Sequence, residues 1–179
     1  MAGNRVNVTR LVVRAVKSGR DEFLREFRHS VLVPHAVQRG ALQDSSSAGS
    51  TLLHLPNFSG DLSLLLDPRV LLLTRDHEER EASILTVGRT LETDISLSDH
   101  SVGLKHARFQ RAASGGWTLQ DLGSKNGTYV DGLRLIPGVP LPVESKQQVL
   151  FGRVLLHFYS PEDLFEVLMA SGSSRGGAD

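Results

Sequence analysis

The sequence predicts a mainly β fold with helices at both ends. From Val70 onwards, short apolar runs alternate with turn residues, as in sandwiches and barrels of many short strands. Residues 9–27 instead carry apolar side chains at helical spacing, and a second amphipathic stretch begins at Ser160-Pro161. We therefore expect a β-sandwich or barrel flanked by N-terminal helices and one C-terminal helix.

The first helix is predicted over residues 9–27, with Thr9 as its N-cap. Leu11, Val12, Ala15 and Val16 share one helix face in its first part, and Phe23, Leu24 and Phe27 share one face in its second part. Ser18-Gly19 interrupts this pattern, which predicts a break between two helical pieces. The apolar run Val31-Leu32-Val33 follows and ends at Pro34.

The N-terminal segment is basic up to its first acidic residue, Asp21. The basic side chains are those of Arg5, Arg10, Arg14, Lys17 and Arg20. We interpret them as a basic helix face, and an organellar transit peptide is the alternative interpretation.

The serine-rich run at residues 44–50 has the composition of a flexible linker. We therefore expect residues 1–67 to be a helical extension with a linker, and residues 68–160 to form the β domain.

Turn chemistry places two hairpins in the β region. Asp131-Gly132 stands between two apolar runs, and this dipeptide supplies the positive φ angles of a type I′ turn. Ser114-Gly115-Gly116 is expected to form another hairpin loop, because strands flank it on both sides. Trp117 and Leu119 are two residues apart, so they point to the same face of their strand.

The C-terminal helix is predicted from Ser160 as cap and Pro161 as first helical residue. Glu162 and Asp163 follow, and acidic side chains are favourable at the positive end of a helix dipole. We expect the helix over residues 161–170, packed on the sandwich or on the N-terminal helices. Residues 171–179 are expected to be a disordered tail.

Composition excludes several classes of function. The 20 basic and 20 acidic side chains balance, so the bulk attraction of a basic protein to nucleic acid is absent. The chain has no cysteine, which excludes disulfides, thiolate metal sites and cysteine nucleophiles. No apolar run approaches the roughly 20 residues of a membrane span. Without a secretory signal pattern, the expected location is the cytoplasm.

Catalytic motifs are also missing from the sequence. It has no Gly-x-Ser-x-Gly elbow, no phosphate-binding Gly-Lys-Ser/Thr loop and no His-Glu-x-x-His helix. We therefore expect a chain that is not an enzyme and that carries no metal or cofactor.

Three separated segments are the most distinctive part of the sequence. They are Val87-Gly88-Arg89, Asp99-His100-Ser101-Val102-Gly103-Leu104-Lys105-His106 and Asp121-Leu122-Gly123-Ser124-Lys125-Asn126-Gly127-Thr128. In this order and spacing, and followed by Phe151-Gly152, they resemble the forkhead-associated (FHA) domain family. The resemblance covers about half of the chain.

This resemblance implies a β-sandwich of about eleven strands whose loops at one end bind a phosphothreonine peptide. The implied partner is a phosphothreonine-containing protein, such as a serine/threonine kinase or its substrate, and neither a nucleic acid nor a membrane. Loops on a rigid sandwich can bind a phosphate well, because they present hydrogen-bond donors to it with little reorganisation.

Family positions assign roles to individual residues. Arg89 matches the arginine that contacts phosphate, and the alternative is an exposed arginine paired with Asp94 or Asp99. Asn126 matches the asparagine that holds the peptide backbone, and the alternative is a plain turn residue. Ser124 and Lys125 share that loop as candidate donors.

Three further residues are expected to be structural. His106 matches a family histidine that holds the loops in shape. Gly88 is expected where a turn needs φ freedom, and Gly127 is expected to be structural in the Asn-Gly turn.

The sequence departs from the family at two phosphate-binding positions. Gly103 stands where a serine hydroxyl usually meets phosphate, and Leu104 stands where a second polar anchor is usual. If this segment is an alternating strand, the Lys105 side chain points away from the phosphate position. The missing phosphate donors would be replaced by a freely exposed Gly103 N–H or by the side chain of Ser101, Lys105 or Lys125. Two interpretations stay open: a variant phosphopeptide site, or a degenerate domain for unphosphorylated partners or oligomerisation.

Overall fold

The computed structural model describes residues 5–34, 69–74 and 84–173, which contain two helices and twelve strands. The helices are α1 (Val8–Glu26) and α4 (Pro161–Ser173). The strands are β1 (Arg5–Asn7), β2 (Val31–Pro34), β3 (Arg69–Leu72), β4 (Ile84–Gly88), β5 (Ile95–Ser96), β6 (Ala107–Arg111), β7 (Trp117–Asp121), β8 (Thr128–Val130), β9 (Leu133–Arg134), β10 (Leu141–Val143), β11 (Gln148–Phe151) and β12 (Val154–Tyr159).

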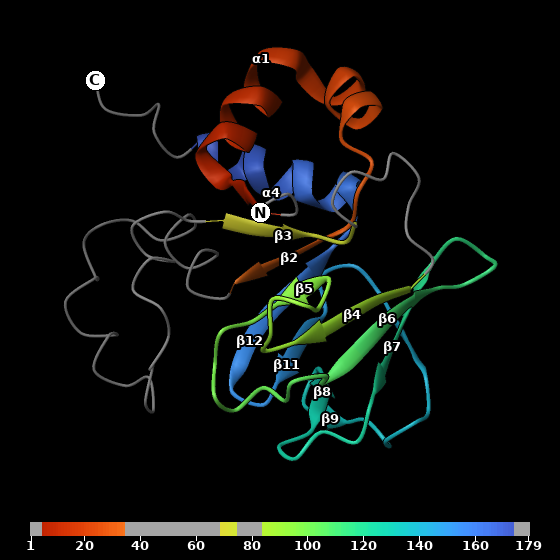
Figure 1. The fold of residues 1–179 in the computed structure, drawn as a ribbon. Coiled ribbons are helices and arrows are strands. Elements are labelled where there is room, and N and C mark those ends of the chain that lie inside the picture. Colours follow the sequence, from red (N-terminus) through yellow and green to blue (C-terminus); the bar gives the residue numbers. More distant parts are fainter. Residues whose placement is uncertain (1–4, 35–68, 75–83, 174–179) are drawn as a thin grey trace.

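The strands form two sheets packed face to face (Figure 1). The larger sheet has the order β1-β3-β2-β12-β11-β8-β9, and the smaller has the order β10-β7-β6-β4-β5. All neighbours are antiparallel except β4 and β5, which are parallel. This arrangement confirms the predicted mainly β sandwich.

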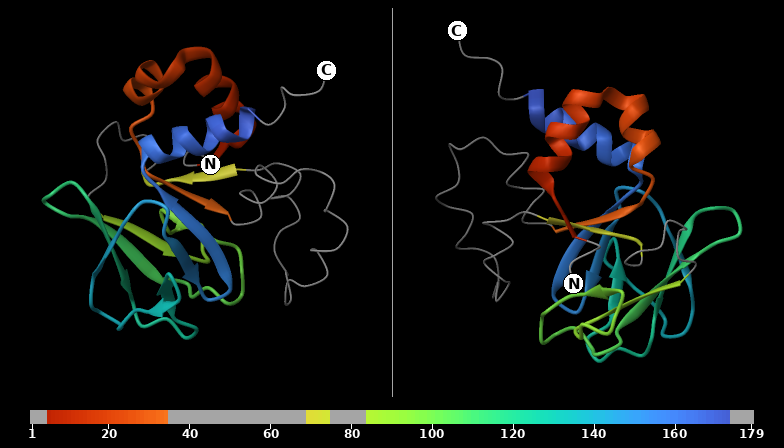
Figure 2. Two further views of the ribbon diagram at one scale, coloured as in Figure 1. Left: turned by 180° about the vertical axis from the view of Figure 1, so that it is seen from behind. Right: turned by 45° about the horizontal axis from the view of Figure 1, so that its top comes forward.

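Alternation along the strands shows why a third layer is needed. In β2, Leu32 faces the core between the sheets, whereas Val31 and Val33 join a second apolar core. In β3, Leu71 faces the core between the sheets, and Val70 joins the second core. The larger sheet therefore has two buried faces, and Figure 2 shows α1 and α4 lying together on its outer side.

The core between the sheets is built around Phe109. Its ring meets Trp117 edge-on at 6.2 Å and stacks on Phe158 at 6.3 Å between centroids. Phe151 lies equally close at 6.3 Å. The aromatic rings thus join strands from both sheets and fix the two sheets against each other.

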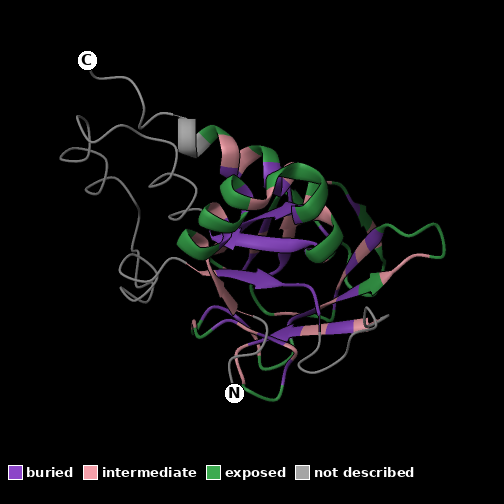
Figure 3. Cartoon of the chain, turned by 90° about the horizontal axis from the view of Figure 1, so that it is seen from above, coloured by how far each residue is buried: buried purple, intermediate pink, exposed green. Residues whose placement is uncertain are grey.

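The second core lies between the helices and the larger sheet. Phe23 of α1 is fully buried and contacts Phe27 at 5.3 Å and Phe165 of α4 at 5.4 Å. Figure 3 shows the consequence: the helices are exposed on their outward side, and the strands beneath them are buried. The C-terminal helix was predicted to pack on the sandwich or on the N-terminal helices, and α4 packs against α1 in this layer.

The start of α1 differs from the sequence prediction. Asn7, not Thr9, is the N-cap, and its Oδ1 accepts a hydrogen bond from the Arg10 N–H at 3.2 Å. Asparagine is a stronger cap than threonine, and it stands one residue before the first helical residue. The predicted break is confirmed at Gly19, whose φ of 71° and ψ of 178° interrupt the helix.

Residues 5–34 belong to the same packed body as the sandwich. Arg5 pairs with Leu71 through β1 and β3, and Val31 pairs with Tyr159 through β2 and β12. The expected extension over residues 1–67 therefore contributes two strands to the larger sheet. Pairings between residues so far apart in sequence leave no local signal, which is why the pattern alone suggested an appendage. The expected linker lies outside the described residues.

Local signals in the C-terminal half were read correctly. Asp131 and Gly132 have φ of 47° and 82°, and they connect β8 to β9 as predicted. Ser160 caps α4 by accepting from the Asp163 N–H at 3.2 Å. The helix continues to Ser173, three residues beyond the predicted end, and residues 174–179 of the expected tail lie outside the described part. Within the described ranges, neither helix is long and apolar enough to span a membrane.

Candidate functional site

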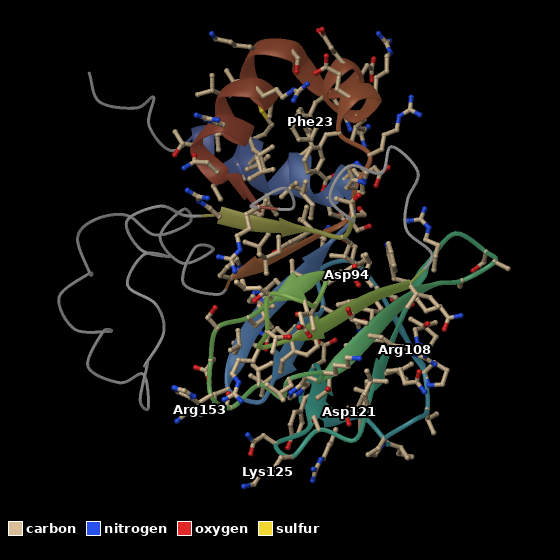
Figure 4. The ribbon with its side chains drawn as sticks, viewed as in Figure 1. Phe23, Asp94, Arg108, Asp121, Lys125 and Arg153 are labelled. Carbon is tan, nitrogen blue, oxygen red and sulfur yellow. The ribbon has the colours of Figure 1, made fainter. Side chains whose placement is uncertain are left out.

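One end of the sandwich collects the segments that the sequence singled out. We call it the loop end, and it consists of residues 89–94, 97–106, 122–127 and 152–153. These loops leave the same end of their strands, opposite the helices. Figure 4 shows Lys125 and Arg153 at this end and Phe23 in the helical layer at the other.

His106 joins two of these loops from a fully buried position. Its Nδ1 accepts from the Gly103 N–H at 3.0 Å, so its Nε2–H donates to the Gly127 carbonyl at 3.1 Å. Burial lowers the pKa of His106, which keeps the imidazole neutral. The structural role expected for His106 matches these contacts, and no side of the ring is left for catalysis.

Asp121 organises the loop between β7 and β8. Its Oδ1 accepts from the N–H groups of Gly123 and Ser124, and its Oδ2 accepts from the hydroxyls of Ser124 and Thr128. Burial opposes its charge, but these four hydrogen bonds prevail and the pKa of Asp121 is lowered. A buried carboxylate thus fixes the backbone on which Asn126 is displayed.

Ser124 is used entirely inside this loop. Its hydroxyl donates to Asp121 at 2.6 Å and accepts from the Gly127 N–H at 3.0 Å. The sequence proposed Ser124 as a donor to the ligand, but its proton is already committed to the carboxylate. We therefore place Ser124 with the residues that shape the loop.

Arg89 is held at the loop end by its backbone and one side-chain contact. Its N–H donates to the Gly103 carbonyl at 2.9 Å, and its Nη1 lies 3.2 Å from Nδ1 of His100. Neither Asp94 nor Asp99 forms an ion pair with it among the described residues, which argues against the alternative drawn from the sequence. Arg89 is half-buried, and His100 is the one side-chain partner of its guanidinium within the described residues.

The Asn126 side chain is hydrogen-bonded to the loop of residues 97–106, which also carries His100. Its Nδ2 donates to the Ser101 carbonyl at 2.7 Å, while its Oδ1 has no partner within the described residues. Ser101 is buried, and its hydroxyl accepts from the Arg153 N–H at 2.9 Å. The structure therefore brings Arg89 and Asn126 together through His100 and Ser101. Ser101 is only 8% exposed, so its hydroxyl offers little surface to a ligand.

Gly88 is required for a different reason from the one expected. Its φ is not positive, so backbone freedom is not the cause. A Cβ on Gly88 would lie 2.1 Å from the carbonyl oxygen of Leu104, which no side chain tolerates. Gly127 has a φ of 83°, and an added Cβ would meet Arg134 Nε at 2.8 Å. The prediction of φ freedom was thus wrong for Gly88, whereas the structural role expected of Gly127 has a positive φ as its physical reason.

The variant positions lie in the loop before β6 rather than in a strand. The Gly103 N–H is bound by His106, so it is not the free oxyanion donor that the sequence suggested. Leu104 is 57% exposed, and Lys105 is also exposed. Because Lys105 precedes β6, strand alternation does not decide its direction. Lys125 is exposed in the neighbouring loop.

The loop end carries four basic side chains (Arg89, Lys105, Lys125 and Arg153) and three acidic ones (Glu92, Asp94 and Asp99). Besides Arg89 and the two lysines, Arg134 lies over the Tyr129 ring at 6.0 Å, beside Gly127. Arg153 Nη2 lies 3.9 Å from Asp99 Oδ1. Across the described ranges, no group of histidine and carboxylate side chains is placed to hold a metal ion. The arrangement suits an anion held by fixed donors.

Sequence reasoning assigned no role to three residues of this network, Asp121, Gly152 and His100. Asp121 was detectable, because an aspartate before Gly123-Ser124 is typical of a turn closed by its own side chain. Gly152 is needed because an added Cβ would lie 2.5 Å from the Ser101 carbonyl, a contact between distant segments. His100 carried no local signal for its contact with Arg89.

Comparisons with known proteins point to one domain family. A model of the FHA domain matches residues 85–152. The FHA domain-containing protein FhaB of Mycobacterium tuberculosis is 35% identical over 57 residues, which are 32% of this chain and 36% of the relative. The oxoglutarate dehydrogenase inhibitor of Corynebacterium diphtheriae is 48% identical over 46 residues, 26% and 32% of the two chains.

The chain thus spans about a third of the length of these curated relatives. Among solved structures, the FHA domain of the CT664 protein from Chlamydia trachomatis is 26% identical, with a TM-score of 0.44, over 51% of this chain and 83% of that one. The matched residues contain Gly88, Arg89, His106 and Asn126 within two packed sheets. This chain therefore contains, at residues 85–152, a domain of the FHA family.

Proposed function

We propose that the loop end recognises a phosphothreonine-containing segment of a partner protein, in signalling by serine/threonine kinases. The observation that carries this proposal is the placement of Arg89. Its guanidinium stands at the loop end without a carboxylate partner in the described part, and Asn126 is fixed one loop away. Membership of the FHA family supports the same assignment.

The chemistry of the two groups is complementary. A phosphothreonine carries a charge of about −1.5 to −2 and three acceptor oxygens at neutral pH. A guanidinium offers it two parallel donors. The Asn126 amide keeps an unused oxygen beside its bonded nitrogen, and such an amide matches the donor and acceptor of a peptide bond.

Gly103 and Leu104 weaken this site relative to the family pattern. Two missing hydrogen bonds to a charged group correspond to roughly 2–5 kcal/mol, which is a loss of about 30-fold or more in affinity. A Cβ added at Gly103 would have only ordinary contacts, the nearest at 3.5 Å from the Lys105 carbonyl oxygen. The serine of the family pattern therefore fits here without rearrangement.

A second candidate function rests on the exposed leucines of the loop end. Leu91, Leu104 and Leu122 are 89%, 57% and 39% exposed. Apolar side chains at a binding surface favour an unphosphorylated partner segment that buries them. The two candidates differ in whether phosphate is required.

Fluorescence anisotropy separates them. The full chain is titrated against a labelled peptide pool with a central phosphothreonine between mixed residues, and against the same pool without phosphate. Arg89→Ala tests the guanidinium, and Gly103→Ser/Leu104→Arg restores the family pattern. We expect phosphate-dependent binding that Arg89→Ala abolishes and that the double variant strengthens.

The opposite result would be a native chain that ignores phosphate while the double variant binds it. The phosphate site would then be lost in this chain, and the leucine surface would become the leading candidate. A double variant that also fails to bind would contradict the assignment of the phosphate position itself.

A further inference from the structure

His100 is the side chain in contact with the proposed phosphate-binding arginine. Its Nδ1 lies 3.2 Å from Arg89 Nη1. A guanidinium only donates hydrogen bonds, so this Nδ1 is the acceptor and the imidazole proton is on Nε2.

A closed turn holds His100 in this position. The Val102 N–H donates to the Asp99 carbonyl at 3.0 Å, and the Ser101 N–H donates to Asp99 Oδ1 at 2.7 Å. The same turn is tied to Asn126 through the Ser101 carbonyl. His100 is therefore an exposed side chain on a fixed backbone, between the two residues assigned to the ligand.

We propose that His100 is a phosphate-binding residue of this chain, which takes up a proton and replaces part of the hydrogen bonding that Gly103 and Leu104 lack. This inference rests on the function proposed above. When phosphate draws the Arg89 guanidinium, Nδ1 loses its donor and becomes free to bind a proton from solvent. The Nδ1–H then donates to a phosphate oxygen, and the charged imidazole lies against a dianion.

The charges around His100 determine the direction of the pH dependence. Arg89 on the β4–β5 loop opposes its protonation, whereas Asp99 in its own turn favours it. Arg153 from the β11–β12 turn partly offsets Asp99, at 3.9 Å, and Glu92 is exposed in the β4–β5 loop. An arriving phosphate adds up to two negative charges and shifts this balance towards the protonated form. Affinity is therefore higher below the pH at which imidazoles lose their proton than above it.

The test compares the native chain with His100→Gln in the same anisotropy titration. Phosphate itself loses charge near pH 6, so both proteins are measured with one peptide pool at about pH 6.5 and about pH 8. We expect His100→Gln to weaken binding about tenfold at the lower pH and less than about twofold at the higher pH. His29→Gln, after α1 in the helical layer, is the matched control and should behave as the native chain.

The outcomes separate the inference from the proposed function. Phosphate-dependent binding that is lost in Arg89→Ala but is equally strong in His100→Gln at both pH values overturns the role of His100 alone. If the native chain shows no phosphate-dependent binding, both the role of His100 and the proposed function are overturned. A tenfold loss that is the same at both pH values would show that His100 acts without its proton, which also contradicts the inference.

Discussion

The helical layer and the loop end are stabilised by different interactions. Phe23 joins α1 to α4 through ring contacts with Phe27 and Phe165, and the core around it is apolar. At the loop end, two buried polar groups, His106 and Asp121, bind the backbone of two loops. One end is thus stabilised by apolar packing and the other by directed hydrogen bonds.

This difference indicates where a ligand can be recognised. Packing is non-directional, and it fixes the larger sheet without presenting polar groups. Hydrogen bonds to a buried imidazole and a buried carboxylate fix loop geometry while leaving Arg89 and Asn126 at the surface. Directed interactions therefore prepare the loop end for binding, and substitutions at the two ends should have different consequences.

The largest effect is expected in the helical layer. Phe23→Ala removes a fully buried ring and should reduce the free energy of unfolding by about 3–5 kcal/mol. Chemical denaturation followed by circular dichroism measures this loss. Below the unfolding transition, phosphopeptide affinity should remain native. A loss under about 1 kcal/mol would show that the N-terminal helices do not stabilise the sandwich.

Asp121→Asn tests the polar network at the loop end. Removing the charge weakens four hydrogen bonds, and the expected loss is about 2–3 kcal/mol near neutral pH. The folded pKa of Asp121 lies below the ordinary value of 3.8, so its contribution is complete above that pH and falls as pH drops through the folded pKa. Chemical denaturation should show that the native chain and Asp121→Asn differ in free energy of unfolding at neutral pH and that this difference disappears at strongly acidic pH. A difference independent of pH would contradict the role of the carboxylate charge.

Two glycine substitutions form a matched pair at one loop. Gly88→Ala places a Cβ 2.1 Å from the Leu104 carbonyl oxygen, and it should cost about 1–3 kcal/mol and weaken binding by displacing the loop. Gly103→Ala has 3.5 Å to its nearest contact, so stability should change by less than about 0.5 kcal/mol. Thermal unfolding of both variants checks the contrast. Equal effects would mean that the close approach at Gly88 does not constrain this loop.

The smallest effect is expected on the outer surface of α1. Arg14 pairs with Glu26, but the two side chains are 49% and 42% exposed. Solvent screens such a pair, and Arg14→Ala should change the free energy of unfolding by less than about 0.5 kcal/mol. A larger loss in denaturant titrations would indicate that polar pairs also stabilise the helical layer.

Local chemistry explains which parts of the fold the sequence predicted. Asp131-Gly132 and Ser160-Pro161 act through their own backbone and side chains, and both were assigned correctly. The N-cap was placed two residues late, because the sequence pattern favoured Thr9 over Asn7. The pairing of Arg5 with Leu71 depends on the assembled sheet, so nothing near Arg5 in the sequence announces it.

The candidate site also contains residues that the sequence predicted and contacts that it did not. Arg89, Asn126 and His106 were found through a family resemblance, and the structure brings them together at one end of the sandwich. The loss of the free Gly103 N–H was not predictable, since it results from the approach of the His106 ring. The contact between His100 and Arg89 likewise requires two loops to meet.

A two-dimensional amide NMR titration tests the central claim most directly, because it reports where the phosphothreonine peptide pool binds. We predict shifts concentrated at Arg89, at His100 and at the side-chain amide of Asn126, and absent with the unphosphorylated pool. Shifts confined instead to the shallow hollow along α1, lined by Arg10, Val13 and Lys17, would contradict the assignment of the loop end.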